Sequence, residues 1–210
     1  MSQENSTNQE QNSEKLEFAM GLTVAVLAAI LALIDLAAGK YGDDFLVAVN
    51  KKVSAYELYH GKVIKETLLE GERDVLQNLI LAGAIIPKDT SLINKTLANF
   101  DSDLRKIEKQ KKEILEGSTK VGKANWAQPD PEGNMGKIVG AKEWEVLAEK
   151  YDKAGNHFDI SIMFMQICLV LGAIGFITKG RRNKLVFEFL MLTFGLIGIY
   201  YGLDALRLAL

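Results

Sequence analysis

The residue types that most often carry chemistry in proteins are sparse in this sequence and far apart. The chain has two histidines, His60 and His157, and one cysteine, Cys168. Neither histidine has a nearby cysteine or a patterned carboxylate, so the ligand spacing typical of a zinc site is missing. A single cysteine allows no disulfide within the chain. These residues therefore predict neither a metal centre nor a thiol cluster.

Two short stretches resemble functional patterns only superficially. The stretch GKVIKET, 61–67, lacks the leading glycine of a phosphate-binding loop and lies in a helical pattern rather than after a strand. Asp101 and Asp103 form a carboxylate pair on a charged helical face, where solvated charge is the simplest interpretation. The sequence contains no serine-nucleophile, zinc-protease or dinucleotide signature. We therefore expect a protein that is not an enzyme, with no catalytic residues and no cofactor.

Three apolar runs dominate the sequence, at residues 16–38, 160–178 and 185–206. A helix rises about 1.5 Å per residue and the hydrocarbon core of a bilayer is about 30 Å thick, so about 20 apolar residues cross it. The runs are apolar on all faces, whereas a helix of a soluble bundle has a polar face. The sequence predicts three transmembrane helices.

The N-terminal segment, residues 1–15, is rich in Gln, Asn, Ser and Glu. This composition buries too little apolar surface to offset chain entropy, so it predicts a disordered tail. The tail is acidic where the first region of a secretory signal is basic, and no small-residue cleavage pattern closes the apolar run that follows. We expect that run to remain as a membrane anchor.

The segment between the first two runs, residues 40–159, has helical periodicity. Its basic and acidic residues nearly balance, so it lacks the basic surface of a nucleic-acid-binding domain. Asp43 and Asp44 are capping candidates for a long helix that Pro87 ends, and DTS at 89–91 caps the next helix. Apolar residues at three-four spacing predict that the two helices zip together as an antiparallel, coiled-coil-like helical hairpin.

Residues 117–140 break the periodicity because they collect glycines and two of the three prolines. We expect a Gly/Pro loop there. The helical pattern resumes at Ala141, and no proline precedes the second apolar run, so one helix is expected to continue into the membrane. The predicted fold class is all-α: an integral membrane protein with three transmembrane helices and a long helical-hairpin soluble domain between the first and second.

A basic loop, KGRRNK at 179–184, joins the second and third runs. Short basic loops stay in the cytoplasm, whereas long domains translocate largely regardless of their charge. This predicts a bacterial inner-membrane protein with a cytoplasmic N-terminus and a periplasmic or extracytoplasmic soluble domain. We expect the basic residues to contact anionic lipid headgroups, with a specific lipid or partner site as the alternative. These residues are Lys179, Arg181, Arg182 and Lys184.

Polar residues within the apolar runs predict contacts between helices. The first and third spans run parallel, so Asp35 and Arg207 lie at the same level and are expected to form an ion pair. The same geometry places Glu17 within reach of the basic loop. Gln166 lies near the midplane of the second span, where a lone glutamine most often forms a hydrogen bond to a neighbouring helix.

Two stretches, YELYHGKVIKE at 56–66 and HFDISIMFMQICLVLGAIGFITKGRR at 157–182, resemble a bacterial membrane family catalogued as domain of unknown function 4337. The similar residues are Tyr56, Tyr59, Lys62, Ile64 and Lys65 in the first stretch, and His157, Phe158, Asp159, Gln166, Arg181 and Arg182 in the second. The resemblance starts at about residue 16 and is poor at 117–140, where the family implies an unbroken charged helix. The family has no assigned activity, so the resemblance implies topology alone.

These features favour a small inner-membrane structural or accessory protein. We expect it to self-assemble, or to dock onto a larger membrane complex through its helical hairpin, because heptad seams and small-residue faces are typical of helix association. Tyr56, Tyr59 and Trp126 are candidate partner contacts, since aromatic side chains are enriched at interfaces. The alternative is a homo-oligomeric channel or transport component, motivated by Gln166. A sensor is a weaker third possibility.

Overall fold

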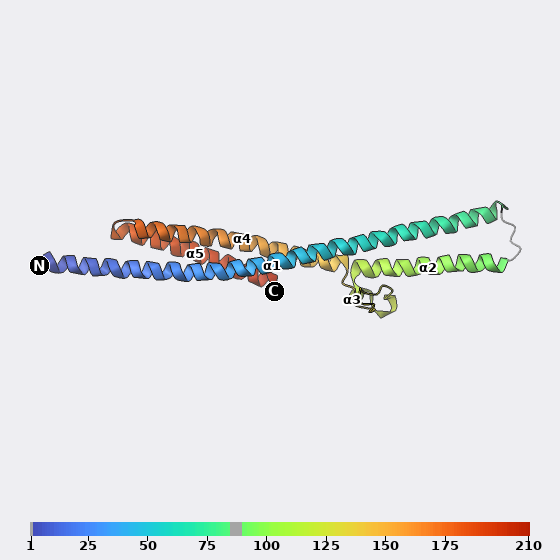
Figure 1. Ribbon diagram of the computed structural model, residues 1–210, viewed down its shortest axis with the longest axis horizontal. Helices are drawn as coiled ribbons and strands as arrows, with labels where there is room; N and C mark the ends of the chain where they lie inside the picture. The colour runs from blue at the N-terminus through green and yellow to red at the C-terminus, as the bar shows by residue number, and fades with distance from the viewer. Residues whose placement is uncertain (1, 85–89) are drawn as a thin grey trace. The chain divides into compact units, whose positions relative to one another are not determined.

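The computed structural model describes residues 2–84 and 90–210, with side chains described for 16–84 and 91–210. No strand occurs among these residues, so the all-α prediction is confirmed. An isolated antiparallel bridge joins Pro129 and Met135. The elements are α1 (Ser2–Leu81), α2 (Thr90–Glu116), α3 (Ser118–Val121), the 3-10 helix η1 (Lys123–Asn125), α4 (Ala141–Ile177) and α5 (Arg181–Ala209) (Figure 1).

Helix α1 is continuous where the sequence predicted a tail, a span and a separately capped helix. Residues 2–15 are helical because extending an existing helix adds a hydrogen bond for each residue without a new nucleus. Asp43 and Asp44 lie inside the helix rather than at a cap. The isolated Gly39 and Gly42 before them cost about 1 kcal/mol each, which is too little to end the helix.

Helix α1 ends before the predicted proline stop, in a Schellman motif. Gly83 has a positive φ of 65° and donates its N–H to the carbonyl of Ile80 at 3.1 Å. The N–H of Ala84 reaches the carbonyl of Leu79, also at 3.1 Å. Pro87 and the first residue of the predicted DTS cap lie outside the described residues.

The connection before α5 is shorter than the predicted basic loop. Helix α4 continues without a break from Ala141 to Ile177, and α5 already begins at Arg181. Arg181, Arg182 and Lys184 therefore belong to the first turn of α5 rather than to a loop. Gly180 permits the sharp turn because its φ is 99°, a conformation that residues with a Cβ rarely adopt.

The chain divides into two compact units. Unit 1 comprises Met1–Phe45 and Glu149–Leu210, and unit 2 comprises Leu46–Ala148. In unit 1, segments of α1, α4 and α5 lie side by side (Figure 1). Their buried apolar residues are Leu27, Ile34, Ala154, Phe158, Met165, Cys168, Met191, Ala205 and Ala209.

Glycines on α5 let the helices of unit 1 approach closely. A Cβ on Gly195 would lie 3.0 Å from Leu27 Cδ2, and a Cβ on Gly202 would lie 3.0 Å from Ile34 Cδ1. Both pairs are one heptad apart along their helices, so α1 and α5 run parallel here. The predicted relative direction of the first and third apolar runs agrees with this packing.

Helices α1, α4 and α5 each contain a window long and apolar enough to cross a membrane. Of the residues in these windows, only 17%, 28% and 22% are buried, so most of their apolar surface faces outward. Contiguous apolar surface of this extent is rare on soluble monomers. The three helices indicate membrane association.

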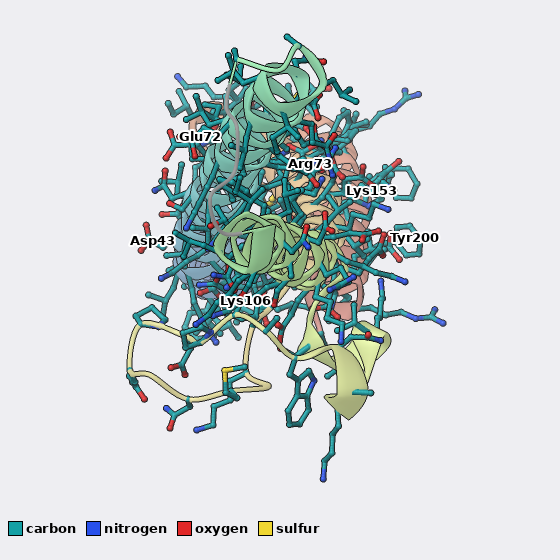
Figure 2. All side chains as sticks on the ribbon, turned by 90° about the vertical axis from the view of Figure 1, so that its right-hand side faces the viewer. Asp43, Glu72, Arg73, Lys106, Lys153 and Tyr200 are labelled. Atoms are coloured by element: carbon teal, nitrogen blue, oxygen red, sulfur yellow. The ribbon has the colours of Figure 1, made fainter. Side chains whose placement is uncertain are left out.

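In unit 2, side chains of α1 and α2 pair in antiparallel order. Lys62 Nζ donates a hydrogen bond to Gln110 Oε1 at 2.9 Å, near the C-terminal end of α2. Arg73, further along α1, lies 3.5 Å from Asp101 in the first half of α2. Lys111 and Glu66 form a further ion pair. Figure 2 shows Arg73 and its neighbour Glu72 on different sides of α1.

Candidate functional site: a folded loop and the polar residues of the apolar helices

The side chain of Glu113 organises the segment 117–140. It is completely buried on α2 even though it is a carboxylate. Its Oε1 accepts a hydrogen bond from Ser118 Oγ at 2.7 Å. Its Oε2 accepts the backbone N–H groups of Ala127 at 2.7 Å and Gln128 at 2.8 Å. These donors replace water around the carboxylate, which makes its burial tolerable.

Ser118 joins the beginning of this segment to its end. Its N–H donates to the carbonyl of Ile138 at 2.8 Å, and its Oγ accepts the N–H of Ile138 at 2.9 Å. The carbonyl of Ser118 accepts a hydrogen bond from Trp126 Nε1 at 2.9 Å. The Trp126 ring packs against Gly136, where a Cβ would lie 2.5 Å from a ring carbon. The segment is thus a folded loop with its own polar core.

Gly117 and Gly140 bring the two ends of the folded loop into backbone contact. A Cβ on Gly140 would lie 2.3 Å from the backbone N of Gly117. Glu143 accepts hydrogen bonds from the N–H of Gly140 at 2.9 Å and from Thr119 Oγ1 at 3.0 Å. A Glu three residues after the cap that bonds back to the cap N–H is half of a capping box. The sequence GAKE carries this signal, which the periodicity analysis missed.

A histidine and a carboxylate meet in unit 1, although no sequence pattern paired them. His157 Nδ1 on α4 lies 2.9 Å from Asp204 Oδ2 on α5. The Nδ1 atom is buried and makes no hydrogen bond among the described residues, so the two groups are close without a directed bond. The His157 ring also meets the Tyr201 ring edge to face at 5.8 Å. Spacing along the sequence could not reveal this contact, because Asp204 comes from a distant helix.

The four basic residues at 179–184 differ in burial. Lys184 is buried and forms an ion pair with Glu17 on α1, as the level of Glu17 predicted. Lys179, Arg181 and Arg182 are exposed. A buried cation at the N-terminus of a helix opposes the helix dipole, so the Glu17 carboxylate compensates an unfavourable position. The remaining three residues are free to meet solvent or lipid.

The predicted ion pair between Asp35 and Arg207 does not form. Both side chains are exposed, and no ion pair joins them in the part of the chain that the structure describes. The register of Ile34 with Gly202 places Asp35 level with Leu203, about 6 Å along the helix before Arg207, and its face also differs from the predicted one. Ile34 occupies the buried face beside Gly202, which leaves Asp35 about 100° away around the helix.

Gln166 also faces away from the bundle of unit 1. Its side chain is exposed, and no hydrogen bond to it occurs among the described side chains. The polar bond between helices comes instead from Ser161, whose buried Oγ donates to the carbonyl of Gly198 at 2.7 Å. Gln166 makes no hydrogen bond to another helix of this chain among the described residues, because Met165 next to it holds the buried position, so the predicted bond to a neighbouring helix would have to form between copies.

All three aromatic residues predicted as partner contacts are partly buried and make contacts within unit 2. The Tyr56 hydroxyl donates to Glu145 Oε2 at 3.3 Å, and burial together with the Glu145 charge raises the pKa of Tyr56. Trp126 is half-buried in the folded loop, with Lys123 Nζ 5.9 Å from its ring centroid. Tyr59 is also partly buried and meets the neighbouring His60 ring edge to face.

The fold and these contacts define an all-helical protein with three helices suited to a membrane. No group of three or more His, Cys, Asp or Glu side chains that could hold a metal ion occurs among residues 16–84 and 91–210. A family model described as domain of unknown function (DUF4337) matches residues 16–208, and the chain belongs to this family. No curated protein and no solved structure matches the chain.

Proposed function

We propose that this protein is a non-enzymatic structural or accessory protein of the bacterial inner membrane. Helices α1, α4 and α5 cross the bilayer, and α1 and α2 form a helical hairpin through which copies self-assemble or dock onto a larger membrane complex. Arg181 and Arg182 support a cytoplasmic junction between α4 and α5, which gives a cytoplasmic N-terminus and an extracytoplasmic unit 2.

An exposed apolar groove on α1 in unit 2 is the observation that carries this proposal. The groove has a volume of about 540 Å³. Its lining residues are Thr67, Leu68, Gly71, Glu72, Val75, Leu76 and Leu79. Leu68 is 63% exposed and Val75 is 59% exposed, although neither lies in an apolar run suited to a membrane. A contiguous apolar patch in water favours coverage by a partner.

The spacing around Gly71 suits a second copy of the same helix. Leu68 and Val75 flank Gly71 on the two sides, and Ile64 and Leu79 lie about one turn further out. In an antiparallel two-fold pair, Leu68 of one copy meets Val75 of the other, and Ile64 meets Leu79. No atom lies within 4 Å of a Cβ position on Gly71, so the helices can cross closely there.

The mass of the purified protein in an uncharged detergent tests this interface. We expect wild type to be oligomeric, and Leu68→Glu with Val75→Glu to raise the dissociation constant at least about 100-fold, because two charges from each copy would be buried at the contact. The matched control is Leu58→Glu with Val53→Glu, which places the same substitutions on exposed residues outside the groove. A monomeric wild type, or an unchanged mass in the groove variant, would overturn the interface.

A channel formed by several copies is the second candidate function, and the exposure of Gln166 favours it. One chain encloses no pore, because Phe158, Met165 and Met191 fill the centre of unit 1. Gln166 faces outward next to the exposed Ile167, where an amide in hydrocarbon lacks a partner. In an assembly of copies, its amide would meet another copy or water in a pore.

Ion flux through liposomes that contain the purified protein tests the channel. We expect Gln166→Leu to change the flux, while Met163→Leu, at another exposed position of α4, leaves it unchanged. Absence of flux from wild type would reject the channel and leave the structural role in place.

A further inference from the structure

A groove in unit 2 lies between the folded loop and the two helices beside it. Its volume is about 620 Å³. Its lining residues are Lys62, Lys106, Gln110, Trp126, Ala127, Gln128, Pro129 and Met135. We call it the lysine groove. It is separate from the apolar groove on α1, and it combines cationic side chains with an aromatic ring and a thioether.

The lysine groove concentrates positive charge without a counter-charge. Lys62 Nζ donates to the neutral amide of Gln110, and none of Lys62, Lys65 and Lys106 pairs with a carboxylate among the described residues. Burial lowers the pKa of Lys62, and the charges of Lys65 and Lys106 lower it further. Figure 2 shows Lys106 on the side of α2 that faces the folded loop. A bound anion would relieve this repulsion.

Buried amides hold the lysine groove in shape. Gln110 is 9% exposed, accepts the hydrogen bond from Lys62 and donates its Nε2 to the carbonyl of Ala127 at 2.9 Å. This bridge fixes Lys62 relative to the folded loop. Gln128 contributes a buried Oε1 that has no hydrogen-bond partner in the described part of the chain. This oxygen is closed off from water, so the Gln128 side chain is packed in place within the lining of the groove.

We propose that the lysine groove binds a phosphate monoester. Its anionic oxygens accept hydrogen bonds from Lys62 and Lys106, and its organic part lies against Trp126 and Met135. A phosphate monoester carries about −1.5 to −2 charges near neutral pH and three acceptor oxygens, which suits two lysines without a carboxylate partner. A carboxylate fits less well because it carries a single charge and two acceptor oxygens. The phosphate group belongs either to a soluble ester or to a lipid headgroup.

Fluorescence of Trp126 in the full-length protein tests the proposal. Trp144→Phe removes the other tryptophan, and the protein is placed in nanodiscs of phosphatidylcholine. Phenyl phosphate is titrated as the soluble probe, with inorganic phosphate beside it. We expect saturable binding, tighter for phenyl phosphate because its ring contacts Trp126. In a second arm, nanodiscs that contain phosphatidic acid, without soluble probe, test the lipid source.

Variants separate the lysine groove from the net charge of the protein. The groove variant, Lys62→Gln with Lys106→Gln, should weaken binding at least 10-fold. The control variant, Lys51→Gln with Lys95→Gln, removes the same charge elsewhere on unit 2 and should leave binding unchanged. Gln128→Glu keeps both lysines and should abolish binding, because it adds a negative charge to the lining of the groove that repels the phosphate and competes for the lysines.

The proposal is supported if Trp126 fluorescence changes with phenyl phosphate or with phosphatidic acid, and if the groove variants weaken this change while the control variant does not. The arm that gives the change identifies the source of the phosphate. No response in either arm, or equal responses in the groove and control variants, would overturn it.

Discussion

Replacing Glu113 tests whether a buried carboxylate holds the folded loop. Glu113→Gln has the same shape and can still pair with Ser118 and with the N–H groups of Ala127 and Gln128, but it loses the charge. A hydrogen bond to a charged group contributes about 1.5–3 kcal/mol, and one to a neutral group about 0.5–1.5 kcal/mol. For these bonds together, which are not additive, we expect a loss of about 2 kcal/mol.

Amide hydrogen exchange at Ala127 and Gln128 measures this loss directly, because these amides exchange when the folded loop opens. A loss of about 2 kcal/mol corresponds to exchange about 30-fold faster, since 1.4 kcal/mol is a factor of ten. Glu113→Ala should be worse, at about 4 kcal/mol, because it leaves the buried N–H groups without acceptors. Glu108→Gln, an exposed carboxylate on α2, is the matched control. Equal exchange rates in Glu113→Gln and wild type would refute the role of the carboxylate.

Two further predictions concern unit 1 and the tip of the folded loop. Gly198→Ala should destabilise unit 1 by about 1–3 kcal/mol, because its Cβ would lie 2.7 Å from Met165 Cγ. Gly155→Ala should instead stabilise unit 1 by about 0.5–1 kcal/mol, because nothing lies within 4 Å of the added Cβ. Chemical unfolding followed by circular dichroism distinguishes the two variants. Equal effects of both substitutions would contradict the close packing at Gly198. The N–H of Asn134 lowers the pKa of Asp130 below its ordinary 3.8. The turn from Asp130 to Asn134 should therefore stay intact at pH 3.8 and above, and loosen only as the pH falls through the lowered pKa. The amide chemical shift of Asn134 reports this opening, and a transition at or above pH 3.8 would contradict it.

The helical class and the apolar runs followed from the sequence because they depend on local composition. The start of α4 at Ala141 was predicted from the return of helical spacing, and α4 is continuous as expected. The ends of α1 were harder to predict. Its composition changes sharply at residue 16 and again near residue 40, but helix propagation ignores such changes unless a proline or a terminating glycine intervenes. Gly83 supplies that end, and a single glycine is a weak signal in a sequence.

The candidate site was harder to predict because its contacts join residues far apart in the sequence. The level of Glu17 along the apolar helices was predictable, and Glu17 meets Lys184 accordingly. The face of the helix on which a side chain lies was not predictable, since a shift of one residue turns the side chain by about 100° around the helix. Gln166 and Met165 show this, because the polar residue is exposed and its neighbour is buried. Glu113 resembles any surface carboxylate of a charged helix until the folded loop closes over it.

The contact between Gly117 and Gly140 makes the folded loop a convenient place to insert another protein. Because the two ends already touch, the loop leaves and re-enters the helical structure at one point. Its turn at Glu132 and Gly133 is exposed. A fluorescent or enzymatic reporter spliced there should leave the helices in register. Such a fusion would reveal on which side of the membrane unit 2 resides in living cells.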